Sequence, residues 1–379
     1  MLLWPLAGYP LALSLIARLR PKPPLPGGMP DAPARPRLII IVPTYNEAAT
    51  IAWRLRNLQD STYPIDMIRA VVVDSGSADG TAAIAERFAA SAPYDVTVIR
   101  EGARRGKAAA INRAIDIIDR DAIAVITDAP TTFAPDALAR IAAAFDDPYV
   151  GAATGTFVVT GEDGWVQRAE ASFWRTRNRL RALEAAVDST PFLSGELCAF
   201  RRRLVDRLDE DTLADDMNVA LQVRRAGYRC VVVNGATFSE QRSNDLTELM
   251  ETKTRRAAGG IQELLRARDM VFDRRYGWFG TLILPSAVLY YLPLRVPAAF
   301  MLAPAALRLL RRAPRPLLVG ALACAITALF RWRERVAMLA LTEWLMIQGW
   351  RRYLLGQMDV RWQQERRTGI ETMDERRAG

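Results

Sequence analysis

The chain has 379 residues, a formal net charge of +9 and no histidine. This length allows one large domain with appendages, or two domains. The lack of imidazole excludes a Ser-His-Asp triad and a histidine metal ligand, so carboxylates must carry any acid–base chemistry. The three cysteines are far apart and have no metal-ligand spacing, which argues against a zinc site and a thiol nucleophile.

The excess of Lys and Arg predicts an anionic partner. These residues are scattered or flank apolar stretches, and the sequence has no zinc-finger, RNP or basic-zipper pattern. We therefore expect no nucleic-acid partner. The charge suits a nucleotide diphosphate and a membrane surface.

Residues 1–20 predict an N-terminal membrane helix. The first 17 residues are uncharged and largely apolar, and basic residues follow at Arg18 and Arg20. A cleaved signal peptide has its charges before the apolar core, so this order indicates a membrane helix with its basic end in the cytoplasm. Residues 21–37 are rich in Pro and Gly and predict a linker without regular structure.

Two apolar runs that end in polar turns predict the first βαβ unit. LIIIVPTYNE (38–47) and AVVVDSGSADGT (70–81) are typical of strands buried in a parallel sheet, and residues 48–59 between them predict an amphipathic helix. The first strand end offers Pro43, Tyr45, Asn46 and Glu47, and the second offers Asp74, Ser75, Ser77 and Asp79. Open α/β sheets bind ligands at such ends, so a nucleotide site is the natural inference.

Strand-like and helix-like runs continue to alternate up to about residue 245. Further strands are expected at 95–100, 123–128, 150–159 and 228–234. The alternation predicts an α/β domain with a mostly parallel sheet.

Later segments carry residues suited to chemistry. A glycine-rich basic turn before a helix would bring Lys107 to a bound anion. Asp128 ends a buried strand, where a carboxylate can take a divalent cation that bridges two phosphates, and Pro130 holds the place of the usual second acid. Asp215 can cap the next helix, which leaves Asp216 in the first turn as a candidate general base, although both acids could serve the helix alone.

Residues 266–356 predict a C-terminal region of membrane helices. Apolar stretches lie at 278–294, 296–310, 316–330 and 336–350. Each is short for a perpendicular crossing, so they either pair into longer bent helices or lie in the interface, and a helical domain outside the membrane is the alternative. Residues 357–379 predict a polar cytoplasmic tail.

In chain order, these segments resemble the inverting family 2 glycosyltransferases with a GT-A fold, particularly the membrane-bound bacterial and archaeal members. The resemblance covers 38–265 and rests on PTYNE, RRGKAAAIN, TDAP, SGELCAF and ADDMNVALQVRRAGY. It implies a Rossmann-like catalytic domain with a mostly parallel sheet, flanked by N- and C-terminal transmembrane or interfacial helices. It also implies a multi-pass protein of the plasma membrane with a cytoplasmic catalytic domain.

The same resemblance implies roles for residues. Asp216 would be the catalytic base, and Asp128 would be the metal ligand for Mg²⁺ or Mn²⁺. The nucleotide-sugar site would comprise Pro43, Tyr45, Glu47, Asp74, Ser75, Lys107, Asp128 and Arg255, and the acceptor side would comprise Ser194, Gly195 and Asp215. Because Pro130 removes the usual second acid, the cation would depend on Asp128, the diphosphate and waters.

The implied reaction transfers a hexosyl or N-acetylhexosaminyl group from a nucleotide-diphosphate sugar, with a UDP-sugar favoured. The acceptor would be a membrane-associated lipid or glycan in cell-surface polysaccharide biosynthesis. Arg255 and Arg256 fall near the Q-x-x-R-W region of polymer-forming members, but the segment lacks its Gln and Trp, which favours addition of one or a few sugars. A processive polysaccharide synthase and, because of Pro130, a catalytically impaired GT-A scaffold are the alternatives.

Overall fold

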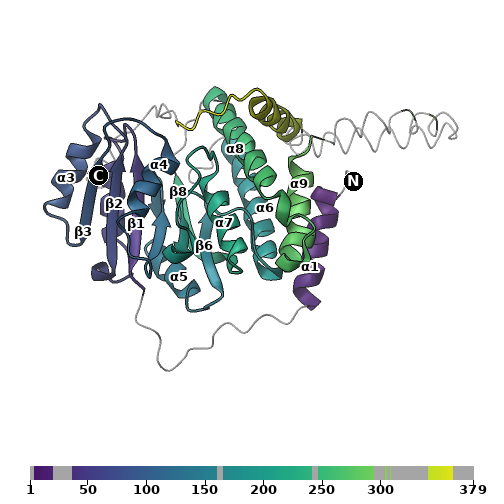
Figure 1. Ribbon diagram of the computed structural model, residues 1–379, viewed down its shortest axis with the longest axis horizontal. Coiled ribbons are helices and arrows are strands. Elements are labelled where there is room, and N and C mark those ends of the chain that lie inside the picture. Colours follow the sequence, from purple (N-terminus) through teal and green to yellow (C-terminus); the bar gives the residue numbers. More distant parts are fainter. Residues whose placement is uncertain are drawn as a thin grey trace.

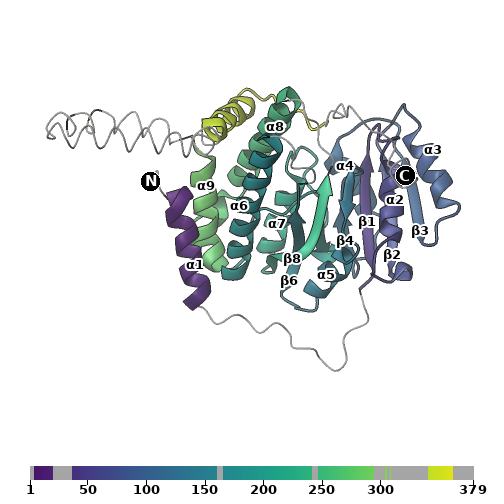
Figure 2. The ribbon, with the colours of Figure 1, turned by 180° about the vertical axis from the view of Figure 1, so that it is seen from behind.

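The computed structural model describes residues 4–19, 36–159, 165–240, 246–293, 304, 308 and 340–361. An eight-stranded sheet with the strand order β3-β2-β1-β4-β7-β6-β8-β5 runs through the molecule. Helices cover both faces of this sheet, and α1, α6, α8 and α9 stand together beyond the end opposite β3 (Figure 1; Figure 2).

The strands are β1 (Leu38–Thr44), β2 (Ile68–Asp74), β3 (Asp95–Arg100), β4 (Ile123–Ile126), β5 (Thr131–Phe133), β6 (Val150–Phe157), β7 (Cys198–Arg201) and β8 (Arg229–Glu240). The α-helices are α1 (Tyr9–Leu19), α2 (Ile51–Gln59), α3 (Thr81–Ala89), α4 (Lys107–Ile115), α5 (Ala137–Ala144), α6 (Trp165–Val187), α7 (Asp215–Arg225), α8 (Leu246–Arg266) and α9 (Leu284–Tyr291). Residues 340–354 are also helical.

The first βαβ unit forms as its sequence predicts. Every residue of β1 is buried, and β1 pairs in parallel with β2 on one side and β4 on the other. Ile51, Leu55 and Leu58 of α2 are all fully buried. The predicted amphipathic face and the mostly parallel sheet are therefore confirmed.

The sheet separates two cores because successive residues of a strand point to opposite faces. Leu38, Ile40 and Val42 of β1 belong to the core that includes α2 and α5. Ile39 and Ile41 belong to the core on the other face, which includes α4 and α7. The runs of unbroken apolar residues in the sequence reflect this burial on both faces.

Two short strands, β5 and β7, were not predicted. β7 lies between β4 and β6 and runs antiparallel to both, with Ile126 opposite Cys198. Because of this reversal, the loop before β7 lies at the same edge of the sheet as the carboxyl end of β4. That loop contains Ser194, Gly195 and Glu196.

A third core lies outside the sheet, in what we call the helical block: α1, α6, α8, α9 and residues 340–354. Its buried members include Leu13, Ile261 and Leu284. Two hydrogen bonds between residues that are distant in sequence tie it together. The Tyr9 hydroxyl donates to Glu184 Oε1 at 2.8 Å, and Trp350 Nε1 donates to the carbonyl of Tyr291 at 2.9 Å.

The predicted membrane helices require a correction. In the part of the chain that the structure describes, none of the helices has both the length and the apolar character needed to cross a membrane. A crossing needs about 20 residues, whereas α1 has 11 and α9 has 8. The predicted multi-pass location in the plasma membrane is therefore wrong for the described residues, and the predicted flanking transmembrane helices have no support.

Several of the predicted segments cannot be compared with the structure. Most of the linker 21–37 and all of the stretch 316–330 lie outside the described residues, as do 336–339. The same holds for 296–310 apart from 304 and 308, and for the predicted tail beyond residue 361.

Candidate active site

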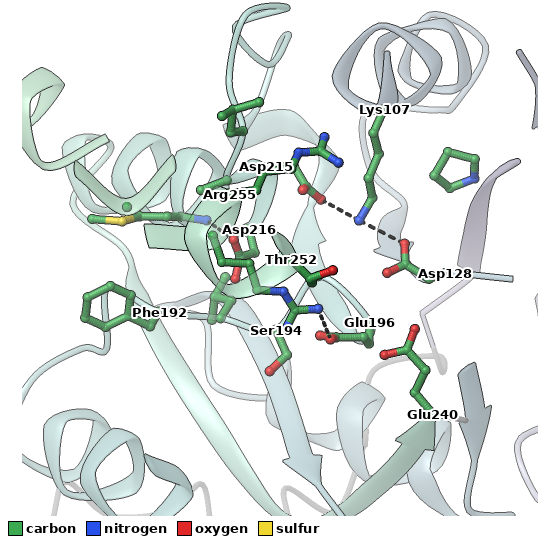
Figure 3. Close-up of a pocket in the computed structure, with 18 of the residues that line it drawn as sticks. Lys107, Asp128, Phe192, Ser194, Glu196, Asp215, Asp216, Glu240, Thr252 and Arg255 are labelled. Atoms are coloured by element: carbon green, nitrogen blue, oxygen red, sulfur yellow. Dashed lines mark hydrogen bonds and ion pairs between the residues drawn. The ribbon is translucent and has the colours of Figure 1, made fainter. Parts of the chain in front are cut away.

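A cavity of about 300 Å³ lies between the carboxyl end of β4 and the helical block (Figure 3). Of the predicted site residues, those that line it are Pro43, Glu47, Lys107, Asp128, Ser194, Gly195, Asp215, Asp216 and Arg255. They come from segments that are far apart in the sequence and that meet at one edge of the sheet. Tyr45, Asp74 and Ser75 are not among the lining residues.

An ammonium group between two carboxylates forms the sheet side of this cavity. Lys107 is the first residue of α4, and its Nζ lies 2.9 Å from Asp128 Oδ1 and 3.2 Å from Asp215 Oδ2 (Figure 3). Burial lowers the pKa of Lys107, but Asp128 and Asp215 more than offset this and raise it above its usual value. Burial also raises the pKa of Asp128, while Lys107 acts to lower it. Lys107 is therefore a fixed positive charge at physiological pH.

Gly106 and Gly195 give this lysine its position. Gly106 precedes α4 with a φ of +107°, in the region that favours glycine. At Gly195, a Cβ atom would lie 3.2 Å from Lys107 Nζ and 3.5 Å from Asp215 Oδ2. A residue without a side chain at 195 therefore leaves the ammonium its place between the two carboxylates.

Asp215 and Asp216 open α7 but face different groups. The prediction that Asp215 caps this helix is wrong, because Ala214 holds the N-cap position and no side chain caps the helix. Asp215 is instead the first residue of α7 and turns its carboxylate to Lys107. Gly227, with a φ of +84°, follows the C-cap residue Ala226 and ends the helix.

Asp216 has the properties of a general base. It lies in the first turn of α7, and its Oδ1 accepts the backbone N–H of Met217 at 2.9 Å. Burial raises the pKa of Asp216 to about 7, with further contributions from the negative charges of Asp215 and Glu196. A base with a pKa near the working pH is suited to accept a proton in a transition state.

Asp128 is the carboxylate best placed to hold a divalent cation. Its Oδ1 pairs with Lys107, and its second oxygen receives no hydrogen bond from any described residue. The described residues contain no cluster of three or more His, Cys, Asp or Glu ligands. Mg²⁺ is commonly bound by one or two carboxylates together with phosphates of a ligand. The residues present therefore fit a cation shared between Asp128 and the phosphates of a bound molecule.

The predicted residues outside the cavity lie at the ends of β1 and β2. Asp74 is buried, and its Oδ2 accepts the backbone N–H of Ser77 at 3.1 Å, so it holds the turn after β2. Ser75 donates to Glu101 Oε2 at 2.8 Å. The guanidinium of Arg104 lies 3.9 Å over the ring of Tyr45.

The helical side of the cavity was not predicted, except for Arg255, which donates to the carbonyl of Val360 at 3.3 Å. Further lining residues on or near this side are Arg177, Arg181, Phe192, Glu196, Arg256 and Tyr291. Arg256 pairs with Glu196 at 3.1 Å. The one signal in the sequence is the four-residue spacing of Arg177 and Arg181, which places both on one face of a helix.

The chain is similar to several known proteins. Residues 39–209 match the family model described as Glycosyl transferase family 2. An N-acetylglucosaminyltransferase of Mesorhizobium japonicum is 26% identical over 268 residues, which are 66% of this chain and 62% of that protein. An N-acetylglucosaminyltransferase of Rhizobium leguminosarum bv. trifolii is 33% identical over 141 residues, which are 35% of this chain and 74% of that protein. The chain spans about half to three-fifths of the length of the first curated relatives it matches.

One solved structure is similar over nearly the whole chain. It is the mannosyltransferase PcManGT from Pyrobaculum calidifontis, in complex with GDP-Man and Mn²⁺. The sequence identity is 30%, the TM-score is 0.72, and the match covers 92% of this chain and 95% of that one.

Proposed function

Since this chain belongs to glycosyl transferase family 2, we propose that it moves a sugar from a nucleotide-diphosphate donor to an acceptor hydroxyl with inversion at the anomeric carbon. The proposed acceptor is a lipid-linked or glycan molecule used in cell-surface glycan synthesis. The names of the relatives support N-acetylglucosamine or mannose as the sugar, carried by UDP or GDP.

The observation that carries the proposal is the position of Asp216. It lines the same cavity as the Lys107–Asp128 pair, and burial raises its pKa to about 7. A displacement at a sugar carbon needs a base beside the attacking hydroxyl. It also needs positive charge beside the leaving group, on the opposite side of that carbon. Figure 3 shows Asp216 and Asp128 projecting into the cavity from different elements.

The proposed reaction is a single displacement. A carboxylate oxygen of Asp216 accepts the proton of the acceptor hydroxyl while the hydroxyl oxygen forms a bond to the anomeric carbon. The bond between that carbon and the diphosphate oxygen breaks, and its electron pair leaves with the nucleotide diphosphate.

Positive charge on the sheet side would stabilise the leaving group. Lys107 lines the cavity and is held there by Asp128 and Asp215, so its ammonium is available to a phosphate oxygen of the bound donor. Arg255 of α8 lines the same space. A divalent cation held by Asp128 and the diphosphate would neutralise further charge as it develops.

The test replaces the base and measures transfer and binding separately. Asp216→Asn should lower sugar transfer roughly 100- to 10,000-fold, because the amide cannot accept the proton. Donor-nucleotide affinity, measured by calorimetry with UDP and GDP in the presence of Mn²⁺, should change little. Asp121→Asn, at an exposed position remote from the cavity wall, is the matched control and should behave as wild type. Full transfer activity in Asp216→Asn would refute the assignment.

The same experiment separates the enzyme from an impaired scaffold. A scaffold would bind a nucleotide sugar but transfer nothing, so wild type and Asp216→Asn would be indistinguishable in a product assay. Sizing the product by mass spectrometry then separates addition of one or a few sugars from polymerisation.

A further inference from the structure

Two arginines of α6 line the cavity without a carboxylate partner. Arg181 is only 2% exposed, and it donates to Ser194 Oγ and to Asn178 Oδ1, each at 2.6 Å. Its Nε is buried and has no hydrogen-bond partner. Neither Arg177 nor Arg181 forms an ion pair with any described residue. Both guanidinium charges are thus held in the wall of the cavity without a counter-ion in contact.

Aromatic rings support the first of these arginines. The guanidinium carbon of Arg177 lies 4.2 Å over the ring of Phe192 and 5.9 Å from that of Tyr290. Phe192 in turn stacks on Tyr291, with ring centroids 5.9 Å apart. The Tyr291 hydroxyl accepts a hydrogen bond from Arg177, which leaves other N–H groups on the edge of this guanidinium for the planar recognition of an oxyanion.

The acidic residues nearby are engaged elsewhere. Glu184 accepts hydroxyl hydrogen bonds from Tyr9 and Thr190, one on each carboxylate oxygen, each at 2.8 Å. Glu196 pairs with Arg256. Burial lowers the pKa of Arg181 to about 10, and the charge of Arg177 adds to this effect. A buried charge without a partner is costly, and an incoming anion would reduce this cost.

The location of the pair points to the acceptor side. Arg181 is hydrogen-bonded to Ser194, and Asp216 is near enough that its negative charge acts to raise the pKa of each arginine, against the effect of burial. Figure 3 shows Phe192, over which Arg177 lies, and Lys107 on opposite sides of Asp216. Arg177, on the ring of Phe192, is therefore separated by the base from the Lys107–Asp128 pair that we assign to the donor diphosphate, and Arg181 lies at Ser194, in the loop before β7.

We propose that Arg177 and Arg181 bind an oxyanion carried by the acceptor, a phosphate or a carboxylate close to the hydroxyl that Asp216 deprotonates. This inference rests on the proposed function and narrows its acceptor to an anionic one. Two guanidinium groups beside a general base select an acceptor that presents negative charge next to its reacting hydroxyl. A neutral acceptor would leave both cations without a counter-ion.

The test measures anion binding without turnover. The protein is saturated with Mn²⁺ and the nucleotide diphosphate that binds it, so that the donor site is occupied. Glucose 1-phosphate, glucuronate and methyl glucoside are then titrated by calorimetry. We expect wild type to bind at least one of the two anionic probes roughly 10- to 100-fold more tightly than the neutral one, and the probe preferred identifies the group as phosphate or carboxylate.

Variants on one helix supply the controls. Arg177→Gln and Arg181→Gln should each reduce the preference about tenfold or more, whereas Arg179→Gln, exposed on the same helix, should retain it. Arg181→Lys, which retains the charge, covers the case in which Arg181→Gln does not fold, as judged by circular dichroism. This variant should still prefer the anionic probe, but less strongly than wild type does.

Two results would overturn the inference. One is equal affinity of wild type for all three probes, and the other is an anion preference that Arg177→Gln and Arg181→Gln retain. Asp216→Asn should keep the preference, because the base takes no part in anion binding. A failure of the transfer reaction and a failure of the anion site therefore give different results.

Discussion

The sheet and the helical block present charge to the same cavity in opposite ways. On the sheet side, Lys107 lies within 3.2 Å of both Asp128 and Asp215, so the positive charge is already compensated. On the helical side, Arg177 and Arg181 have no carboxylate in contact among the described residues. When an anionic ligand binds on the sheet side, Lys107 must give up contacts with its carboxylates. On the helical side, the arginines gain a counter-ion and lose none. The first arrangement suits a ligand that brings its own cation, and the second suits a bare anion.

The largest expected effect is a loss of stability when the paired lysine on the sheet side is removed. Lys107→Met leaves Asp128 and Asp215 facing each other without a cation, which should cost about 3 kcal/mol of unfolding free energy. It should also weaken binding of the nucleotide diphosphate. Urea unfolding measures the first effect and calorimetry measures the second.

Arg105→Met is the matched control for this change. Arg105 forms a 2.9 Å ion pair with Glu210, but the side chains are 62% and 45% exposed. Such surface pairs contribute about 0–1 kcal/mol. Equal losses of stability in Lys107→Met and Arg105→Met would show that the sheet-side pair is not the compensated site we describe.

The second expected effect is a dependence of activity on pH that is set by Asp216. The pKa of Asp216 is raised to about 7, and only its ionised form can accept a proton. The value of kcat/KM should therefore fall about tenfold per pH unit below 7, or roughly 100-fold at pH 5. Removing the like charge with Asp215→Asn lowers the pKa of Asp216, so the acidic limb of the profile should move to lower pH. A limb that stays in place in Asp215→Asn would contradict the coupling.

The smallest expected effect tests whether the helical block can be destabilised without a change in nucleotide binding. Tyr9→Phe removes a buried hydrogen bond between α1 and α6 and should cost about 1 kcal/mol. Ser14→Ala, on the same helix, removes only a local bond to the carbonyl of Pro10 and is the control. Nucleotide affinity should stay unchanged in both variants. Weaker nucleotide binding in Tyr9→Phe would show that the block also supports the sheet side.

The sheet side could be predicted because its residues follow a local rule. Lys107, Asp128 and Asp216 each stand at the end of a strand or the start of a helix, and such ends converge at one edge of a sheet. β7 was missed because four residues are too few for a periodicity. It is nevertheless the reversal of β7 that brings Ser194 to the carboxyl end of β4.

The residues on the helical side of the cavity could not be predicted, because the location of their side chains depends on how the helices pack together. A helix with Arg177 and Arg181 four residues apart is typical of a solvated surface. Only the packing of α6 against α1 and the contact of Arg177 with Tyr290 of α9 show where these side chains lie. The error at the N-terminus has a related cause. An apolar segment such as α1 is explained equally well by lipid and by protein neighbours, and Leu13 is fully buried against the latter.

The buried Asp216 also has a thermodynamic consequence. Its pKa is higher in the folded chain than the ordinary value of 3.8, so folding favours its protonated form. Its contribution to stability is complete below that ordinary value and is lost as the pH rises through about 7. The proton that Asp216 must release to act as the proposed base is thus one that the native state holds more tightly than the unfolded chain does. With respect to this residue, the pH range that favours the proposed reaction is the range in which the fold is least favoured.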